Sequence, residues 1–348
     1  MTRKDTRLTA IDVFSGCGGL TTGLKRSGFE VITAIEQAEA PSQAFRLNHP
    51  DVPVLQTDVR NVRAATLMDA LSIEKGQLDL LAGCSPCQGF SRMRTRNHRI
   101  AAKDDRNDLI LEFARLAAGL RPRVVLIENV PGLAHDPRFR QLATALRSLG
   151  YDVAYSVLDL SEFGIPQRRK RLIVIASRVG PIPLPHGHAD PGTVRSAIGH
   201  LPSPRESSDP IHRSVTSHST RIARKIAKVP RNGGSRADLG PRQQLQCHKR
   251  LRGFWDVYGR MAWDRPSPTI TRFSTNPSKG RYLHPTQNRA ITLREAALLQ
   301  TLPSRYRFPL KRFGRGAVAS MIGEALPPVF AAQVGRWIKR HILSQMEP

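Results

Sequence analysis

Residues 83–99, GCSPCQGFSRMRTRNHR, contain two cysteines in a C-x-x-C arrangement, followed at once by a train of arginines. A free thiol has a pKa of about 8.5, and nearby positive charge favours the reactive thiolate. Cys87 follows the apolar run LDLLAG, so we expect it on a loop at the carboxyl edge of a sheet, where open α/β folds bind ligands. The pattern therefore favours a single nucleophilic cysteine, Cys87.

Three other uses of the cysteine pair stay open on the residues alone. A redox pair usually opens a helix, whereas the proline and glycine of SPCQG indicate a loop. A zinc site would need two more ligands, and Cys17 and Cys247 form no second pair, so no metal is expected. Inert structural cysteines are the third alternative.

A glycine-rich turn, DVFSGCGGL (12–20), stands between an expected strand and an expected helix. Such a turn lets a ligand approach the backbone and reach the helix N-terminus. Glu36 ends the next apolar run, at a position where doubly wound folds commonly place an acid that accepts hydrogen bonds from ribose hydroxyls. Asp58 follows VLQT, another expected strand end. These positions favour a nucleoside cofactor, which the residues alone do not identify.

Two polar clusters adjoin further strand patterns. Glu128 ends the run VVLIEN, where a carboxylate can act as an acid or a hydrogen-bond partner, although a turn-capping acid is a serious alternative. QRRKR (167–171) precedes LIVIAS, and arginines there can neutralise phosphate or bind a carbonyl oxygen, although solvated basic clusters are common.

Apolar runs alternate with amphipathic stretches in the first half of the chain, which predicts an α/β fold with a parallel sheet. Strands are predicted over 10–14, 29–36, 78–83, 124–129 and 172–177, and helices over 20–28, 107–120, 293–302 and 330–343. Residues 179–285 are rich in Pro, Gly, Ser and Arg with weak periodicity. We therefore expect an α/β domain over 1–178, an irregular basic module over 179–285, and a return to the first domain over 286–348.

The charge balance points to a polyanionic partner. The 348 residues include 54 Lys and Arg against 28 Asp and Glu, a net charge of +26 that costs stability unless nucleic acid relieves it. A merely soluble basic protein is the alternative. The N-terminus shows no secretory signal pattern, and no run approaches the roughly 18 apolar residues of a membrane helix. An intracellular protein without a membrane partner is expected.

Taken in order, these motifs resemble the DNA (cytosine-5) methyltransferase family, from Asp12 to about Phe330. The resemblance rests on DVFSGCGG, Glu36, Asp58, SPCQGFS, ENVPG, QRRKR, RAITLREAALLQ and IGEALPP. It implies a doubly wound mixed sheet of the S-adenosylmethionine-dependent methyltransferase (Rossmann-like) type, with a small, irregular target-recognition domain over 179–285.

The resemblance also implies S-adenosyl-L-methionine as cofactor, with S-adenosyl-L-homocysteine as product. Glu36 would hold the ribose, Asp58 the adenine amino group, and Leu109 would pack on the adenine. The other residues expected at the cofactor are Phe14, Gly16, Cys17, Gly19, Glu324 and Ala325. Glu324 stands where the family usually has asparagine. The extra carboxylate could impair cofactor binding, alter cofactor preference or turnover, or pair harmlessly with an arginine; we expect activity to be kept.

The same resemblance implies a covalent mechanism on a cytosine flipped out of duplex DNA. The Cys87 thiolate would add to C6, protonated Glu128 would hydrogen-bond N3, and Arg171 would hold O2. Asn129 would help to position Glu128, and Arg169 with Gln167 would support the site or contact phosphate and the mobile loop.

Double-stranded DNA is the expected partner. The residues expected to contact it are Gln88, Ser91, Arg92, Arg94, Arg96, Arg99, Gln167, Arg224, Lys225, Lys228, Arg231 and Arg272. A monomer in the cytoplasm, associated with the nucleoid, is expected, and a separately acting cognate restriction endonuclease stays open. So do two alternative functions: a non-catalytic DNA-binding relative and an RNA methyltransferase of the same family.

Overall fold

The computed structural model describes residues 7–86, 108–240 and 256–346, and the chain divides into two compact units. Unit 1 comprises Met1–Asp159, Lys170–Gly187 and Leu326–Pro348. Unit 2 comprises Leu160–Arg169 and His188–Ala325. The chain thus leaves unit 1 twice and returns to it at its C-terminal end.

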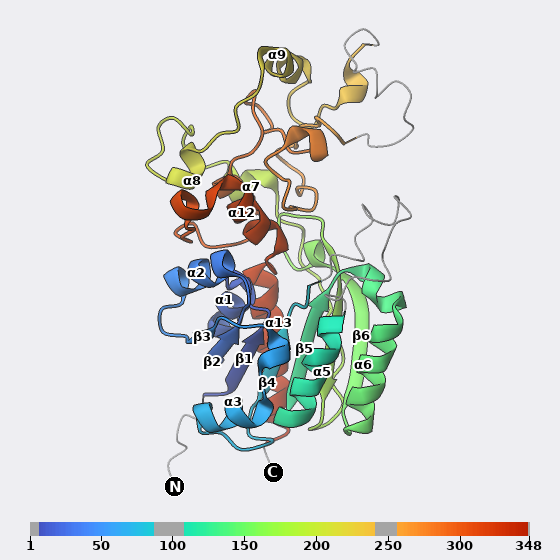
Figure 1. Ribbon diagram of the computed structural model, residues 1–348. Coiled ribbons are helices and arrows are strands. Elements are labelled where there is room, and N and C mark those ends of the chain that lie inside the picture. Colours follow the sequence, from blue (N-terminus) through green and yellow to red (C-terminus); the bar gives the residue numbers. More distant parts are fainter. Residues whose placement is uncertain (1–6, 87–107, 241–255, 347–348) are drawn as a thin grey trace. The chain divides into compact units, whose positions relative to one another are not determined.

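Unit 1 is built on a seven-stranded sheet in the order β3-β2-β1-β4-β5-β7-β6 (Figure 1). The strands are β1 (Thr9–Val13), β2 (Glu30–Ile35), β3 (Val54–Leu55), β4 (Leu80–Gly83), β5 (Val124–Asn129), β6 (Asp152–Asp159) and β7 (Lys170–Ser177). Strands β1 to β5 are parallel, and β7 runs antiparallel to both of its neighbours. All six residues of β5 are buried, as in a sheet covered on both faces.

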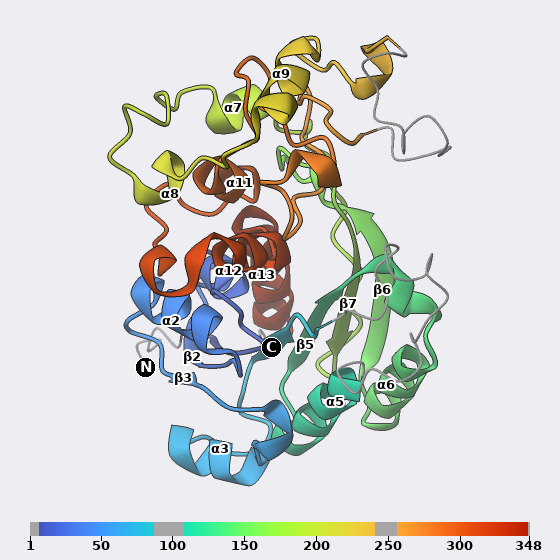
Figure 2. The same ribbon diagram turned by 45° about the horizontal axis from the view of Figure 1, so that its top comes forward.

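Helices cover both faces of this sheet. They are α1 (Gly19–Arg26), α2 (Glu39–Asn48), α3 (Ala64–Leu71), α5 (Leu109–Leu120), α6 (Pro137–Ser148) and α13 (Pro328–Ser344), and short 3₁₀ turns occur at Val59–Asn61 and Pro131–His135. Helices α3, α5 and α6 lie on one face and pack through Leu67, Phe113 and Leu142, while α1 and α13 pack together on the other (Figures 1 and 2). The α/β class with a mixed sheet is confirmed.

The contact between α1 and α13 depends on a glycine. A Cβ at Gly23 would overlap Ala331 Cβ and come within 2.8 Å of the carbonyl oxygen of Pro328. We expect Gly23→Ala to lower the free energy of unfolding by about 1–3 kcal/mol, because overpacking forces the two helices apart. Urea unfolding measures this. Gly316→Ala is the control: its Cβ would meet nothing within 4 Å, so the variant should be neutral or stabilised by up to about 1 kcal/mol.

Every strand and helix predicted from the sequence is present. Strand ends differ from the prediction by at most two residues, and the predicted helix over 293–302 ends earlier, at Leu299. Periodicity missed α2, α3, α6, β6 and the helix Leu310–Glu324. β6 is an edge strand with several exposed residues, so it lacks the continuous apolar run that marks the other strands.

The two compact units do not coincide with the expected domain boundaries. The first domain was expected to end at 178 and to resume at 286, whereas the contacts assign 160–169 and 188–325 to unit 2 and return the chain to unit 1 at Leu326. The reason is packing: α11 (Leu293–Leu299) contacts α7 (Val194–Ile198), α8 (Pro210–Arg213) and α12 (Leu310–Glu324), all within unit 2.

Unit 2 is otherwise irregular, as its composition predicted. Besides these helices it contains α9 (Thr220–Lys228), 3₁₀ turns at Leu160–Glu162, Arg236–Asp238 and Pro277–Lys279, and isolated β-bridges (Figure 2). A small apolar cluster of Ile226, Val229, Leu239, Tyr258 and Leu283 holds α9 in place.

One helical run among the described residues, Leu310–Ser344, is long and apolar enough to cross a membrane, and an 18-residue window within it has a mean hydropathy of 1.3. Within the protein, 72% of that window is buried, and the run consists of α12 and α13 joined by Ala325, Leu326 and Pro327. Core helices of globular proteins have the same character.

Candidate active site

The glycine turn after β1 leaves its backbone open to a ligand. Phe14, Gly16 and Gly18 all have positive φ angles, of 60°, 56° and 96°, so the chain reverses sharply before α1 begins at Gly19. A Cβ at Gly16 would meet nothing within 4 Å, and Cys17 is buried beneath the turn. An open turn at a helix N-terminus is the arrangement that the expected cofactor residues require.

Glu36 lies directly against this turn. The Gly16 N–H donates to Glu36 Oε2 at 2.9 Å, and the Ala38 N–H donates to Oε1 at 2.8 Å. Burial raises the pKa of the Glu36 carboxyl, and these backbone hydrogen bonds oppose the rise. The backbone of Gln37 also hydrogen-bonds this carboxylate, which accepts about four hydrogen bonds in all, so acceptor capacity for the ribose remains.

The adenine side of the expected pocket is only partly arranged as predicted. Leu109 is buried in the large core cluster, and Phe14 packs against the same cluster. Asp58 instead caps a 3₁₀ turn: Oδ1 accepts from the Arg60 N–H at 2.9 Å and Oδ2 pairs with the Arg60 guanidinium at 3.1 Å. An adenine amino group would have to share this carboxylate with Arg60.

The structure reveals a carboxyl group that the motif analysis did not single out. Asp12, on β1, is fully buried, and its Oδ2 accepts a hydrogen bond from Thr21 Oγ1 at 2.6 Å. Burial raises the pKa of Asp12 to about 7, with the Thr21 hydrogen bonds opposing and the nearby Glu36 carboxylate adding to the rise. The only sequence signal was an acid inside the apolar run AIDVF.

We expect Asp12→Asn to remove one component of the pH dependence of stability. Because the folded-state pKa is raised from 3.8 to about 7, protonated Asp12 contributes stability that is complete below pH 3.8 and is lost as pH rises to about 7. Asparagine can still accept from Thr21, so the stability of the variant relative to the wild type should increase by a few kcal/mol, at most about 4, across this range. Urea unfolding at several pH values measures it. Parallel profiles for the two proteins would contradict the shift.

His49 also stabilises the glycine turn before α1. Its Nε2 lies 3.1 Å from Thr22 Oγ1 and 3.2 Å from the carbonyl oxygen of Gly18, and its ring packs on Phe45. Burial lowers the pKa of His49 to about 4, so the ring is neutral near pH 7. A neutral ring tied to Gly18 fixes the start of α1.

Glu128 and Arg171 meet at the carboxyl end of β5. Arg171 Nε lies 2.7 Å from Glu128 Oε1, and the Glu128 residue is only 6% exposed. The antiparallel register pairs Glu128 with Ile173 and Asn129 with Leu172, which brings Arg171 beside the end of β5. The structure therefore brings together the two groups expected at N3 and O2 of cytosine.

Asn129 holds the loop that leads to the cysteine. Its Nδ2 donates to the carbonyl oxygen of Ser85 at 3.0 Å and to Ser85 Oγ at 2.9 Å, and both residues are buried. Cys84, expected to be a buried packing residue, is half-buried directly after β4. These hydrogen bonds fix the backbone at Ser85, two residues before Cys87. Cys87 itself lies outside the described residues.

Two residues of QRRKR, Gln167 and Arg169, are buried within unit 2. Gln167 is fully buried in unit 2 and donates to the carbonyl oxygen of Leu299 at 3.1 Å and to Gln300 Oε1 at 2.5 Å. Arg169 is buried with it and donates to the carbonyl oxygens of Ile270, Gly323 and Ala325. Burial of both side chains argues against a phosphate contact, and their other expected role, support of the site, stays a prediction.

The same network holds the end of α12, where two cofactor contacts were expected. Gln300 donates to the carbonyl oxygens of Ile322 and Ala325, at 2.8 and 2.9 Å. Glu324 is exposed at the last position of the helix, and Ala325 follows as its C-cap. Their proximity to the cofactor stays a prediction.

The residues expected to contact DNA divide by exposure. Arg224, Lys228, Arg231 and Arg272 are exposed on unit 2. Lys225 is not: it is 8% exposed, and its ammonium lies 4.4 Å from the centre of the Tyr258 ring. Lys225 therefore packs α9 onto its apolar cluster, and its expected phosphate contact is corrected. The remaining expected contacts, Gln88, Ser91, Arg92, Arg94, Arg96 and Arg99, lie outside the described residues.

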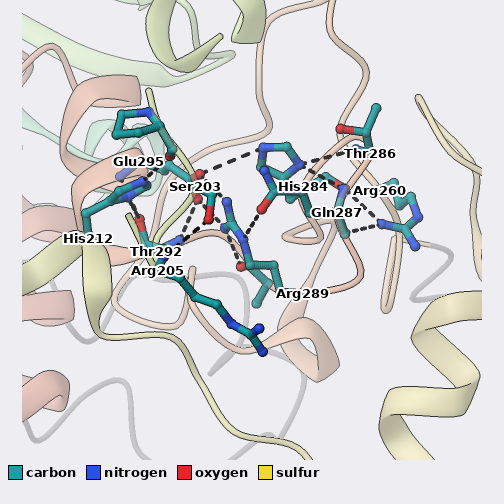
Figure 3. Close-up of polar contacts among 12 residues, drawn as sticks. Ser203, Arg205, His212, Arg260, His284, Thr286, Gln287, Arg289, Thr292 and Glu295 are labelled. Carbon is teal, nitrogen blue, oxygen red and sulfur yellow. Dashed lines mark hydrogen bonds and ion pairs between the residues drawn. The ribbon is translucent and has the colours of Figure 1, made fainter. Parts of the chain in front are cut away.

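A buried polar network gives unit 2 its framework (Figure 3). Arg289 binds both carboxylate oxygens of Glu295, at 2.6 and 2.7 Å, and Arg260 donates to five oxygens that include the carbonyl oxygens of Ile226 and Val229. Burial alone would raise the pKa of Glu295, but the hydrogen bonds and charge of Arg289, together with His284 and the Thr292 N–H, lower that pKa overall. Burial lowers the pKa of His284 to about 4. The hydrogen bonds that Arg260 donates to the carbonyl oxygens of Ile226 and Val229 hold the C-terminal end of α9.

Comparison with known proteins identifies the family of this chain. The family model of C-5 cytosine-specific DNA methylases matches residues 8–340. The type II methylase M.HgiDII of Herpetosiphon aurantiacus is 35% identical over 95% of both chains, and the type II methyltransferase M1.HphI of Haemophilus parahaemolyticus is 33% identical over 94% of this chain and 85% of its own. A solved prophage-encoded protein of E. coli, assigned as a DNA modification methyltransferase, has a TM-score of 0.73 at 22% identity, covering 97% of this chain and 99% of its own.

The match spans both the sheet that carries Glu128 and Arg171 and the irregular unit with its exposed basic residues. The chain is an enzyme and belongs to the C-5 cytosine-specific DNA methylase family.

Proposed function

We propose that this protein transfers a methyl group from S-adenosyl-L-methionine to C5 of a flipped-out cytosine in a specific duplex DNA sequence, through a covalent bond between Cys87 and C6. The observation that carries the proposal is the buried ion pair between Glu128 and Arg171. The next residue, Asn129, hydrogen-bonds Ser85, which lies two residues before Cys87 in the chain.

The residues at the glycine turn fit the proposed cofactor. Gly16 offers an unobstructed backbone, Glu36 keeps acceptor capacity for a ribose hydroxyl, and Phe14 and Leu109 provide apolar surface. When bound, the cofactor supplies an electrophilic methyl group on its sulfonium. The Asp58 carboxylate, which also pairs with Arg60, would accept a hydrogen bond from the adenine amino group.

The proposed chemistry uses the chain's own groups in a fixed order. The Cys87 thiolate forms a bond to C6, and the electron pair of the C5–C6 double bond becomes available at C5 for attack on the methyl group. In its protonated form Glu128 would donate a hydrogen bond to N3, and Arg171 would donate to O2, so that charge arriving on the ring is stabilised. Loss of the C5 proton then restores the double bond and releases the thiolate; no residue on the described chain is assigned as the base.

The proposed DNA contact on unit 2 includes α9. Arg221, Arg224 and Lys228 are exposed on this helix, while Ile222 and Ile226 face the apolar cluster. With Arg231 and Arg272, they would contact phosphates, because exposed cations position a protein on the duplex without reading its sequence.

Incubation with tritiated S-adenosyl-L-methionine and mixed-sequence duplex DNA tests the proposal. Label should enter the DNA, and an excess of unlabelled transfer RNA should not compete for it. Normal cofactor binding without label in DNA would refute the enzymatic proposal, and preferential labelling of RNA would refute the DNA substrate. Bisulfite sequencing of DNA from expressing cells would then identify the target sequence.

We expect Glu324→Asn to leave the rate of methyl transfer within about threefold of the wild type, because Glu324 is exposed at the end of α12. Initial rates at several cofactor concentrations measure this. A many-fold increase in rate would show instead that the carboxylate inhibits the enzyme.

A further inference from the structure

The connection between α11 and α12 carries a second concentration of positive charge on unit 2. Residues 296–323 contain five Lys or Arg and no Asp or Glu. Four of these cations are exposed: Arg305, Arg307, Lys311 and Arg312. We call these four residues the α11–α12 basic surface. No motif considered above includes them.

The backbone beneath Arg305 and Arg307 is firmly held. Tyr306, between them, is 3% exposed, and its carbonyl oxygen accepts a hydrogen bond from Arg294 Nη2 at 2.9 Å. Arg294 is itself fixed by Asp209, at 2.5 Å. Because the residue between them is anchored in the core, the two arginines are presented outward from a fixed backbone, which reduces the entropy lost on binding.

The start of α12 presents the other two cations. Gly314, with φ 73° and ψ 175°, interrupts the helix after one turn. Lys311 and Arg312 precede this kink and are exposed, whereas Arg315 follows it and donates inward to the carbonyl oxygen of Ser214 and to Thr216 Oγ1. This first turn contains no acid that would neutralise the two cations.

Four exposed cations within eight residues repel one another, and their repulsion is relieved by a polyanion. We propose that the α11–α12 basic surface binds the phosphate backbone of duplex DNA independently of sequence. This surface is distinct from the exposed basic residues of α9, which belong to another part of unit 2 (Figures 1 and 2). The choice of duplex DNA as the polyanion rests on the proposed function.

The test is a variant with all four cations neutralised, R305Q/R307Q/K311Q/R312Q. Its affinity for a random-sequence DNA duplex, without cofactor, is measured by fluorescence anisotropy over a range of salt concentrations. Each lost phosphate contact should reduce the slope of log K against log salt by about 0.9, so the total change should lie between about 2 and 4. At about 100 mM salt the affinity should fall at least about tenfold. The kcat at saturating DNA should stay within about twofold, since none of the four contacts the reacting groups.

A matched variant separates local contacts from the general field of the protein. R26Q/R140Q/R147Q/R336Q removes the same four charges from exposed positions on unit 1. Its salt slope should change by less than about 1. An equal loss of affinity in the two variants would overturn the proposal, and so would an unchanged slope in the first variant when urea unfolding shows that it is folded.

RNA provides the remaining comparison. If neutralising the α11–α12 basic surface weakened binding of an RNA duplex but left DNA binding unchanged, the proposed partner would be wrong. Because binding is measured without cofactor or turnover, these results stand apart from the methyl-transfer assay. Absence of methyl transfer in the wild-type protein would refute the proposed function while leaving the binding result interpretable.

Discussion

Replacing Cys87 with serine should abolish methyl transfer while changing DNA affinity by no more than about twofold. A serine hydroxyl is not ionised near neutral pH, so the variant has no thiolate to add to C6. Removal of the nucleophile from a covalent enzyme lowers kcat by on the order of 10⁴-fold or more. Transfer of tritium to DNA measures the rate, and fluorescence anisotropy measures the binding.

Cys84→Ser is the matched control, because it makes the same atomic change three residues away. Cys84 is half-buried directly after β4, and the variant should keep measurable activity. DNA containing 5-fluorocytosine offers a second measurement, since its C5 has no proton to lose. The wild-type protein and Cys84→Ser should form a covalent complex with it on a denaturing gel, and Cys87→Ser should not. If the two serine variants exchanged these behaviours, Cys84 would be the nucleophile.

Glu128→Gln should lower kcat by about 10²- to 10³-fold, with little change in DNA affinity. The buried carboxyl is proposed to stabilise charge that arrives on the cytosine ring in the transition state, and removal of one such group typically costs this much. Glutamine keeps the size of the side chain and can still accept from Arg171, so a folded protein is expected. Single-turnover kinetics and urea unfolding together separate lost catalysis from lost stability.

The QRRKR motif offers the control for this experiment. Arg168 is exposed, unlike its buried neighbour Arg169, and Arg168→Gln should keep kcat within about twofold. Arg171→Ala should instead reduce both kcat and the free energy of unfolding, because it leaves the buried Glu128 carboxylate without its ion pair. Full activity in Glu128→Gln would show that the Glu128–Arg171 pair is only structural.

Strands with continuous apolar runs were predictable because burial on both faces demands such a run. β5 is the clearest case: its predicted and observed bounds coincide at 124–129. The edge strand β6 escaped prediction because its exposed residues carry no such constraint. The C-terminal boundary of unit 2 was also missed, since amphipathic helices such as α11 and α12 show an apolar face without indicating which unit will cover it.

The identity of a basic residue did not reveal whether it was exposed. Arg224 and Lys225 are neighbours with the same charge, yet one faces solvent and the other lies against Tyr258. Within QRRKR, Arg169 is enclosed by carbonyl oxygens of unit 2, whereas Arg171 pairs with Glu128. Arginine and lysine have long apolar stems, so burial of either is decided by neighbours distant in the sequence.

By itself, the sequence determined the order of the motifs, the α/β class, the glycine turn and the acids that follow its strands, because each depends on residues close together in the chain. Only the tertiary structure decided that Arg171 reaches Glu128, that Asn129 holds Ser85, and that Asp12 is a buried carboxyl with a pKa near 7. The antiparallel placement of β7 beside β5 creates the first of these contacts, and enclosure by the sheet and α1 creates the last. Strand order and burial depend on contacts between distant segments, and such contacts leave no local pattern in the sequence.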